Sequence, residues 1–429
     1  MSSDSYRLDS LLEITSSKRI HMADYVPSGV PFYRGKEVIE RAKGNSVSTE
    51  LFITHAQYQE IKRKFGSPQD GDILLTSVGT LGVAYFIDGD GDFYFKDGNV
   101  TWFRNFDPRV VPRYLYYWLT SPETQKRLDE VSIGSTQRAL TISALKSLQV
   151  QLPSVDSQRA IVDMLDAVTN RITLLRETNA TLEAIAQALF KSWFVDFDPV
   201  RAKMEGRTPE GMDEATAALF PDGFETSELG EVPRGWRVGS VYDISKVVYG
   251  APFASKLFKA APPGRPLVRI RDLKDERPGV FTEEVHPKGY LLKPGDIAVG
   301  MDGEFRAYVW GGETAWLNQR VCVFHPINGA SSAFVRLSIA PLLAAVEASE
   351  TATTVIHLGK NDIDRFRVIL PSSTVLHAFR AVAKPVYERL VLNKQKAQTL
   401  STLRDTLLPR LISGQLRLPE AQAALETTP

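Results

Sequence analysis

The residues of this 429-residue chain that could do chemistry do not gather into a catalytic pattern. The sequence has neither a Gly-x-x-x-x-Gly-Lys phosphate loop nor a Gly-x-Ser-x-Gly nucleophile elbow. Its six histidines stand apart, without the spacing of metal-ligand pairs, so we expect them to be structural and the chain to hold no metal. They are His21, His55, His286, His325, His357 and His377.

Three aspartates are the remaining candidates for chemistry. Asp72 and Asp296 each follow a glycine and precede a predicted strand, where aspartate commonly caps a turn, so we favour a structural role. Asp272 and Lys274 have the Asp-x-Lys spacing of some nucleases, but so short a pattern recurs by chance. We therefore expect a chain with no catalytic residues and no bound cofactor.

Charge is balanced over the whole chain but not locally. Basic and acidic residues number 51 each, yet 18–43 carries six basic and three acidic residues, and 256–293 carries nine and five. Such stretches permit two surfaces for an anionic partner. Cys322 is the only cysteine, which excludes internal disulfides and cysteine-rich zinc sites. Because the start is polar and no apolar run approaches roughly 18 residues, we expect a soluble cytoplasmic protein without a membrane span.

A predicted helix over 154–197 must position these surfaces. Its apolar residues are alternately four and three apart over more than four heptads, which is typical of a coiled-coil strip. The one polar position, Asn179, would cost stability but fix the register. The strip consists of Ile161, Leu165, Val168, Ile172, Leu175, Asn179, Leu182, Ala186, Leu189 and Trp193.

The same pattern returns at a constant offset of 218 residues, which indicates a duplicated unit. The second helix departs from the first at equivalent positions of the repeat: Asn393 stands where the first helix has Leu175, and Leu376 where it has Gln158. In addition, Pro385 should kink or break the second helix. The strip residues of the second helix are Phe379, Ala383, Val386, Leu390, Leu400, Leu407 and Leu411.

The sequence therefore predicts an α+β fold with two tandem mixed α/β domains and two long helices that pair as an antiparallel coiled coil, in a pseudo-two-fold repeat. Removing one heptad should shorten the helical bar by about 10 Å. The predicted boundaries are 1–152 for the first domain, 153–197 for the central helix, 198–235 for a linker with at most one short helix near 213–219, 236–371 for the second domain, and 372–429 for the second helix and tail.

Six segments together resemble the specificity subunits of Type I restriction-modification systems. Leu-Phe-Lys-Ser-Trp-Phe-Val-Asp-Phe-Asp-Pro-Val at 189–200 is similar to the end of that family's central conserved helix, and Glu-Val-Pro-Arg-Gly-Trp at 231–236 to the entry into its second recognition domain. Gly-Asp-Ile at 295–297, Met-Asp-Gly at 301–303 and Leu-Asn-Gln-Arg-Val at 317–321 resemble the pattern within that domain. Thr-Leu-Leu-Pro-Arg-Leu-Ile-Ser-Gly at 406–414 resembles the end of the second conserved helix.

The resemblance implies that each domain is a target recognition domain that reads one half of a split double-stranded DNA sequence. The helices would set the number of unread base pairs and dock two methyltransferase subunits, which would hold S-adenosylmethionine and methylate adenine. Two translocating nuclease subunits would join for cleavage. An alternative is a two-headed protein-interaction scaffold, supported only by the neutral charge, and an autonomous nuclease would rest only on Asp272 and Lys274.

Basic and amide side chains on loops are the candidate DNA contacts, and a solvated or salt-bridged surface residue is the alternative for each. We expect Lys18, Arg19, Arg34, Lys36, Arg269, Arg271 and Lys274 to contact phosphates. We expect Gln137, Arg138, Arg306, Gln319 and Arg320 to read bases, because Arg and Gln present fixed donor patterns.

Overall fold

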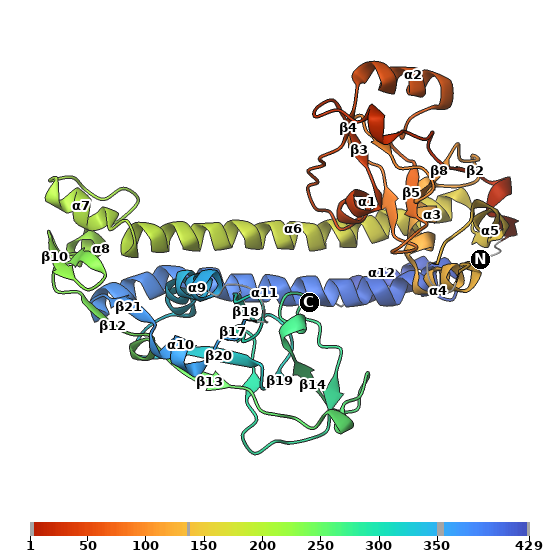
Figure 1. Cartoon of the computed structure of the whole chain (residues 1–429). Helices are drawn as coiled ribbons and strands as arrows, with labels where there is room; N and C mark the ends of the chain where they lie inside the picture. Colours follow the sequence, from red (N-terminus) through yellow and green to blue (C-terminus); the bar gives the residue numbers. More distant parts are fainter. Residues whose placement is uncertain (1–3, 135–137, 350–355, 427–429) are drawn as a thin grey trace. The chain divides into compact units, whose positions relative to one another are not determined.

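The computed structural model describes residues 4–134, 138–349 and 356–426, which form two compact units (Figure 1). Unit 1 comprises 1–170 and 400–429, and unit 2 comprises 171–399. Each unit holds one sheet-rich domain and part of each long helix, α6 (Val155–Phe194) and α11 (Ser373–Ile412). The predicted α+β fold class is confirmed, whereas the predicted domain boundaries stay a prediction, since the units divide within the helices.

Unit 1 consists of short strands covered by helices, and α12 near the end of the chain packs in the same core (Figure 1). Its strands are β1 (Asp4–Arg7), β2 (Glu13–Thr15), β3 (Val30–Tyr33), β4 (Phe52–Ile53), β5 (Ile73–Thr76), β6 (Ala84–Phe86), β7 (Tyr94–Phe95), β8 (Val100–Arg104) and β9 (Gln149–Leu152). Its helices besides α6 and α11 are η1 (Leu8–Ser10), η2 (Met22–Asp24), α1 (Gly35–Ala42), α2 (His55–Phe65), α3 (Pro112–Thr120), α4 (Pro122–Val131), α5 (Ile142–Ser147) and α12 (Leu418–Glu426).

Unit 2 repeats this plan with additions at its start. Its strands are β10 (Phe224–Ser227), β11 (Gly230–Pro233), β12 (Arg237–Ser240), β13 (Ser245–Tyr249), β14 (Arg265–Val268), β15 (Phe281–Thr282), β16 (Leu291–Leu292), β17 (Ile297–Gly300), β18 (Ala307–Val309), β19 (Ala315–Leu317), β20 (Val321–Pro326) and β21 (Arg367–Leu370). Its helices are α7 (Asp198–Met204), α8 (Glu214–Ala218), η3 (Val241–Asp243), η4 (Ser255–Leu257), η5 (Ile270–Asp272), α9 (Ser332–Ser349) and α10 (Lys360–Asp364).

The two domains share one sheet topology, which confirms the internal repeat. The four-stranded sheet has the order β2-β8-β5-β6 in unit 1 and β13-β20-β17-β18 in unit 2. The second sheet is β4-β3-β7 in unit 1 and β15-β14-β19-β16 in unit 2, and in both copies β3 or β14 pairs in parallel with β7 or β19. The central strands β5 and β17 are buried along their whole length, as their apolar sequences require.

The segment predicted to be a linker is more structured than expected. The predicted short helix is present as α8, but α7 and the β10–β11 hairpin accompany it, so the limit of one helix is wrong. Val200 and Phe220 are buried in the unit 2 core with Phe194 of α6, and Val232 is also buried. These apolar residues are too widely spaced to form a periodic pattern, and only their common packing on the helix end orders the segment.

In unit 2 the helices α6 and α11 run antiparallel. Asn393 Nδ2 donates to Asn179 Oδ1 at 3.0 Å, and Asn179 Nδ2 donates to the Leu390 carbonyl at 3.1 Å. Fourteen residues later on α6 and fourteen earlier on α11, the rings of Trp193 and Phe379 lie 5.6 Å apart. The polar residue that fixes the register of α6 therefore meets a second buried asparagine, and the Oδ1 atom of Asn393 has no partner among the described residues.

The predicted strip residues follow this register in both units. In unit 1, Ile161 and Leu165 share one core with Leu407 and Leu411. Pro385 does not break α11, so that part of the prediction is wrong. Pro385 is exposed, so water can bond the carbonyl that loses its helical partner. Among the strip residues, Ile161, Leu165, Val168, Ile172, Leu175, Asn179, Ala186, Trp193, Phe379, Ala383, Leu390, Leu407 and Leu411 are buried, and Leu182, Leu189, Val386 and Leu400 are half-buried.

Ion pairs attach each domain to its helices. In unit 1, Arg113 of α3 lies 3.0 Å from Asp166 of α6. In unit 2, Arg336 of α9 lies 3.3 Å from Glu183 of α6. A second unit 2 pair joins Lys394 of α11 to Glu276 at 2.7 Å. These contacts are shielded from water, so each domain is held at a defined orientation to the helix segments of its own unit.

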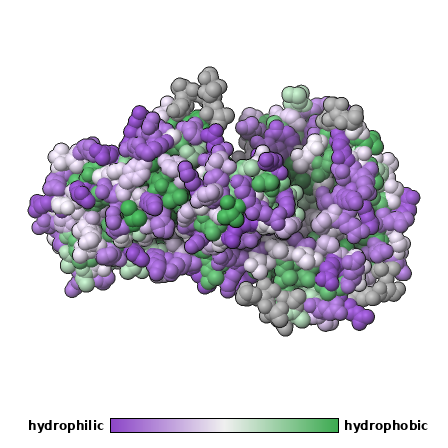
Figure 2. Space-filling model, turned by 90° about the horizontal axis from the view of Figure 1, so that it is seen from below, coloured by the Kyte–Doolittle hydropathy of each residue, from purple (hydrophilic) through white to green (hydrophobic). Residues whose placement is uncertain are grey.

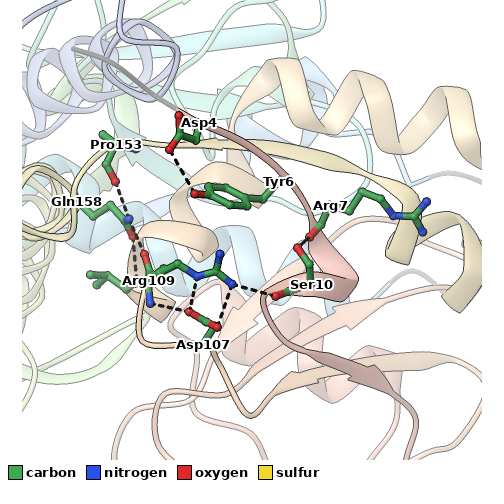
Figure 3. A network of polar contacts seen from close by, with 9 residues as sticks. Asp4, Tyr6, Arg7, Ser10, Asp107, Arg109, Pro153 and Gln158 are labelled. Carbon is green, nitrogen blue, oxygen red and sulfur yellow. Dashed lines mark hydrogen bonds and ion pairs between the residues drawn. The ribbon is translucent and has the colours of Figure 1, made fainter.

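Gln158 joins the start of α6 to the unit 1 domain (Figure 3). Its side chain is fully buried, accepts from the Val111 N–H at 2.8 Å, and donates to the carbonyls of Arg109 and Pro153 at 2.9 Å each. Arg109 in turn forms an ion pair with Asp107 at 2.7 Å. The twin position in unit 2, Leu376, is buried in an apolar core, so the departure between the copies exchanges a polar anchor for an apolar one.

The expectation that no apolar segment is long enough for a membrane span is wrong for helix α9. Among the described residues, it alone has the length and apolar composition of a span. Its buried side chains pack in the unit 2 core, and its Arg336 forms the ion pair with Glu183. The buried side chains of α9 are Ala333, Phe334, Val335, Ile339 and Leu343. Helix α9 therefore packs on the unit 2 core through these five side chains.

Substitution of Asn179 and Asn393 should show how much their side-chain hydrogen bond contributes to the stability of unit 2. We expect Asn179→Leu or Asn393→Leu alone to lower the thermal unfolding midpoint by about 2–6 °C, because each leaves a buried polar group unpaired at a cost of about 1–2 kcal/mol. The double variant removes both groups and should recover the midpoint. Single variants that unfold like the unchanged chain would contradict this role.

Gln158→Leu should weaken the anchor of α6. The change leaves the Val111 N–H and two carbonyls without partners, so we expect a loss of about 1–3 kcal/mol and faster hydrogen exchange at the Val111 amide. The reciprocal Leu376→Gln serves as the control, since it places an amide in an apolar core and should destabilise unit 2 without changing exchange at Val111.

Candidate nucleic-acid interface

The loops at one end of the unit 2 sheets form a continuous surface, which we call the unit 2 loop face (250–251, 268–274, 301–306, 318–320 and 356–358). Backbone hydrogen bonds connect its segments: Ala251 to Leu317 at 3.0 Å, Asn318 to Val268 at 3.1 Å, Met301 to Arg320 at 2.9 Å and Leu358 to Met301 at 2.8 Å. Gly250 permits the close approach, because a Cβ there would lie 2.1 Å from the Asn318 carbonyl oxygen. The face carries Arg269, Arg271, Lys274, Arg306, Gln319 and Arg320, all predicted to contact DNA.

Unit 1 has an equivalent loop face (16–19, 33–36, 77–79, 94–99 and 138–140). Its bonds repeat the pattern: Lys96 donates to the Tyr33 carbonyl at 2.8 Å, Ser77 to Asn99 at 2.8 Å, and Leu140 to Ser77 at 2.9 Å. The segment 16–19 joins through Ser17 Oγ, which donates to the Phe95 carbonyl at 2.7 Å. This face carries Lys18, Arg19, Arg34, Lys36 and Arg138, whereas Gln137 lies outside the described residues.

Most of the predicted arginines form ion pairs with nearby carboxylates. Arg34 and Arg269 occupy equivalent places and bind the acid three residues later, Glu37 at 2.7 Å and Asp272 at 3.2 Å. The other pairs are Arg19 with Asp97 at 2.8 Å, Arg138 with Asp129 at 2.5 Å, Arg306 with Glu347 at 2.7 Å and Arg320 with Asp302 at 3.6 Å. These carboxylates hold the guanidinium groups in place while leaving donors exposed.

Hydrogen bonding sets the charge of these groups. The bond to Asp97 raises the pKa of Arg19, and the bond to Glu347 raises the pKa of Arg306. Burial acts to raise the pKa of Glu37, but its bonds from Arg34 outweigh burial and hold that pKa below its usual value. Arg19 and Arg306 are thus held as cations by these bonds.

Other side chains that are predicted to contact DNA form no ion pair with a carboxylate of the described residues. Lys36, Arg271, Lys274 and Gln319 are exposed, and their side chains form no hydrogen bond or ion pair with the residues that the structure describes. The Lys18 ammonium lies 5.1 Å from the centre of the Phe65 ring. Free cations of this kind suit sequence-independent phosphate contacts.

The three candidate aspartates have structural partners. Asp72 accepts from the Gln69 N–H at 3.0 Å, and Asp296 accepts from the Lys293 N–H at 2.8 Å, which confirms the turn-capping role. Burial raises the pKa of Asp72, which also accepts from the Trp102 indole at 2.8 Å. Asp272 accepts from the Arg269 backbone at 2.9 Å, so its carboxylate closes the η5 turn.

Sequence reasoning did not single out His357 or Asp302 for binding. His357 Nδ1 lies 2.8 Å from Asp302 Oδ1, and Arg320 Nε lies 3.6 Å from Asp302 Oδ2. Both His357 and Arg320 are about half exposed on the unit 2 loop face. At the offset of 218, His357 is the equivalent of Ala139 in the first copy. This difference between the two copies is the sequence signal that could have identified His357 as a candidate binding residue.

Hydrophobic surface does not dominate the face shown in Figure 2, where hydrophobic residues lie in small groups among hydrophilic ones. Such a surface is typical of a protein that meets water or a polar partner. The loop faces, with their cations and amides, therefore have the chemistry of a nucleic-acid interface.

Comparisons with known proteins agree with this chemistry. The family described as "Type I restriction modification DNA specificity domain" matches residues 3–184. The Type I restriction enzyme MjaIX specificity subunit of Methanocaldococcus jannaschii is 29% identical over 82% of this chain and 78% of its own length. The HindI specificity subunit of Haemophilus influenzae is 26% identical over 81% of this chain and 86% of its own.

A solved structure shows the same fold. The S subunit of a Type I restriction-modification system from M. genitalium aligns over 96% of both chains with a TM-score of 0.55 and 17% identity. The family match covers the first copy of the repeat and part of α6, whereas the structural alignment reaches both copies and both long helices. Residues 3–184 thus match a Type I restriction modification DNA specificity domain, and the chain is similar to Type I restriction enzyme specificity subunits over 81–82% of its length.

Proposed function

We propose that this chain directs a Type I restriction-modification complex to a split double-stranded DNA target, with each domain reading one half. The observation that carries the proposal is the repeat: one sheet topology and one loop face, with cations at equivalent places, occur twice in the chain. Two readers on one chain suit a target of two separate half-sites.

The twelve predicted contacts divide between positioning and readout. Lys18, Arg19, Arg34, Lys36, Arg269, Arg271 and Lys274 would hold phosphates, and Gln137, Arg138, Arg306, Gln319 and Arg320 would reach base edges. Ion pairs preorganise arginines of both groups, because a guanidinium held by a carboxylate loses less conformational entropy on binding.

The long helices would set the number of base pairs between the half-sites and dock two methyltransferase subunits. Each helix contributes residues to both units, so its length is a candidate for the spacing. Leu174 and Ile185 of α6 and Val382 and Leu392 of α11 keep 40–52% of their surface exposed, which suits docking of partner helices.

The chemistry would belong to the partners. The methyltransferase subunits would hold S-adenosylmethionine and methylate adenine, and two translocating nuclease subunits would join for cleavage. This chain would be a non-catalytic cytoplasmic component, whose residues bind, orient and space the DNA. Its cationic loop faces support the DNA partner.

Exchange of residues 1–152 for the matching segment of a relative with another target should change one half of the motif. Half-sites would be read independently, because each loop face is built within one unit. The measurement is sequencing of modified adenines in a host that expresses the chimera with its methyltransferase.

The reciprocal exchange of 236–371 is the control and should change only the other half. If either chimera altered both halves, or neither, two independent readers could not be present. A chain that gave no split motif would favour the protein-interaction scaffold.

Lengthening both helices by one heptad should change the spacer but neither half-site. Tandem duplication of 171–177 in α6 and of 395–401 in α11 lengthens both helices by the same amount on the same side of the Asn179–Asn393 pair, so the pairing within each unit is preserved. Seven residues add about 10 Å, which is up to about three base pairs of DNA. Methylome sequencing reads the spacer directly.

Duplication in α6 alone is the matched control, because it lengthens only one helix between the Asn179–Asn393 pair and the unit 1 core contacts. Both sets of contacts then cannot form together, which should prevent assembly. An unchanged spacer in the double duplication would exclude the helices as the measuring element.

A further inference from the structure

We propose that Asp302, His357 and Arg320 form a base-reading triad that determines part of the second half-site, with Asp302 as the positioning residue. The proposal rests on the proposed function and names the residues of one reader. Because the three residues come from three separate segments of the unit 2 loop face, only the fold brings them together.

Geometry assigns a role to each side chain. A carboxylate can only accept, so His357 Nδ1 must carry the hydrogen in its 2.8 Å bond to Asp302 Oδ1. The Nε2 atom of a neutral imidazole is then an acceptor, which matches the amino group of adenine or cytosine in the major groove. Arg320 presents donors, which match guanine.

Exposure leaves both readers accessible. The side chains of Arg320 and His357 are 54% and 46% exposed, whereas Asp302 is 27% exposed behind them. The carboxylate therefore lies on the protein side and holds two outward groups, as a preorganised recognition site requires.

The other copy of the repeat argues that the triad is not needed for folding. The bridge between Asp302 and His357 has an exact backbone counterpart between Val78 and Ala139 in unit 1. The neighbouring bonds also correspond, since Met301 donates to the Arg320 carbonyl as Ser77 donates to that of Asn99. The same backbone hydrogen bonds therefore form in unit 1 with Val78, Ala139 and Asn99 at these positions. The side chains of Asp302, His357 and Arg320 are specific to unit 2.

The test is methylation by the complete complex of this chain with its methyltransferase subunits, at fixed salt, on duplexes randomised in the second half-site. Asp302→Val with His357→Ala rebuilds the unit 1 pair in unit 2. We expect an unchanged first half, an unchanged spacer, and loss of about 10-fold preference at one or two adjacent positions of the second half. An unchanged second half would overturn the proposal.

Single variants separate the roles. His357→Ala should abolish discrimination against a duplex whose amino group at the affected position is replaced by hydrogen, while the unchanged chain retains it. Asp302→Asn should weaken preference at the positions read by both His357 and Arg320, which a residue that acted on only one of them would not do.

Assembly provides the remaining decision. If both the double variant and His357→Ala failed to assemble, the trio would be structural and the proposal wrong. If the unchanged chain gave no split motif, the proposed function would fail instead, and the two failures are thereby distinguished.

Discussion

The whole chain depends on the need of two long helices to cover each other's apolar strip. A 40-residue helix with one apolar edge is unstable in water unless a partner buries that edge. Here each copy of the repeat supplies one helix, and the buried Asn179 and Asn393 pair selects one register. Arg113 and Arg336 then join each domain to the helix segment of its own unit.

Much of this architecture follows from local patterns. The heptad spacing and the offset of 218 predicted the helix pair and the repeat, because periodic burial leaves a periodic sequence. The meeting of Asn179 with Asn393 was not predictable, since the overlap of two antiparallel helices depends on packing at their ends, where Trp193 meets Phe379. The structured segment after α6 escaped prediction for the same reason.

The loop faces were predictable by residue type more than by geometry. Basic loop residues identified both faces, but the carboxylates that hold them come from other segments, as with Asp97 and Glu347. The local partners Glu37 and Asp272 were within reach of sequence reasoning, because an acid three residues after an arginine can cap a helical turn. His357 emerged only when the two copies were compared position by position on a shared framework.

The composition of unit 1 has a consequence for biosynthesis. Its core includes Leu407, Leu411 and Ala421 together with Leu115 and Ile161, so it joins the beginning of the chain to its end. The ribosome must make the whole of unit 2 between these two contributions, which takes roughly ten to fifty seconds at about 5–20 residues per second. The N-terminal domain of unit 1 therefore completes its core after unit 2 has been synthesised, and a truncation that removes Leu407, Leu411 and Ala421 damages the core of that domain.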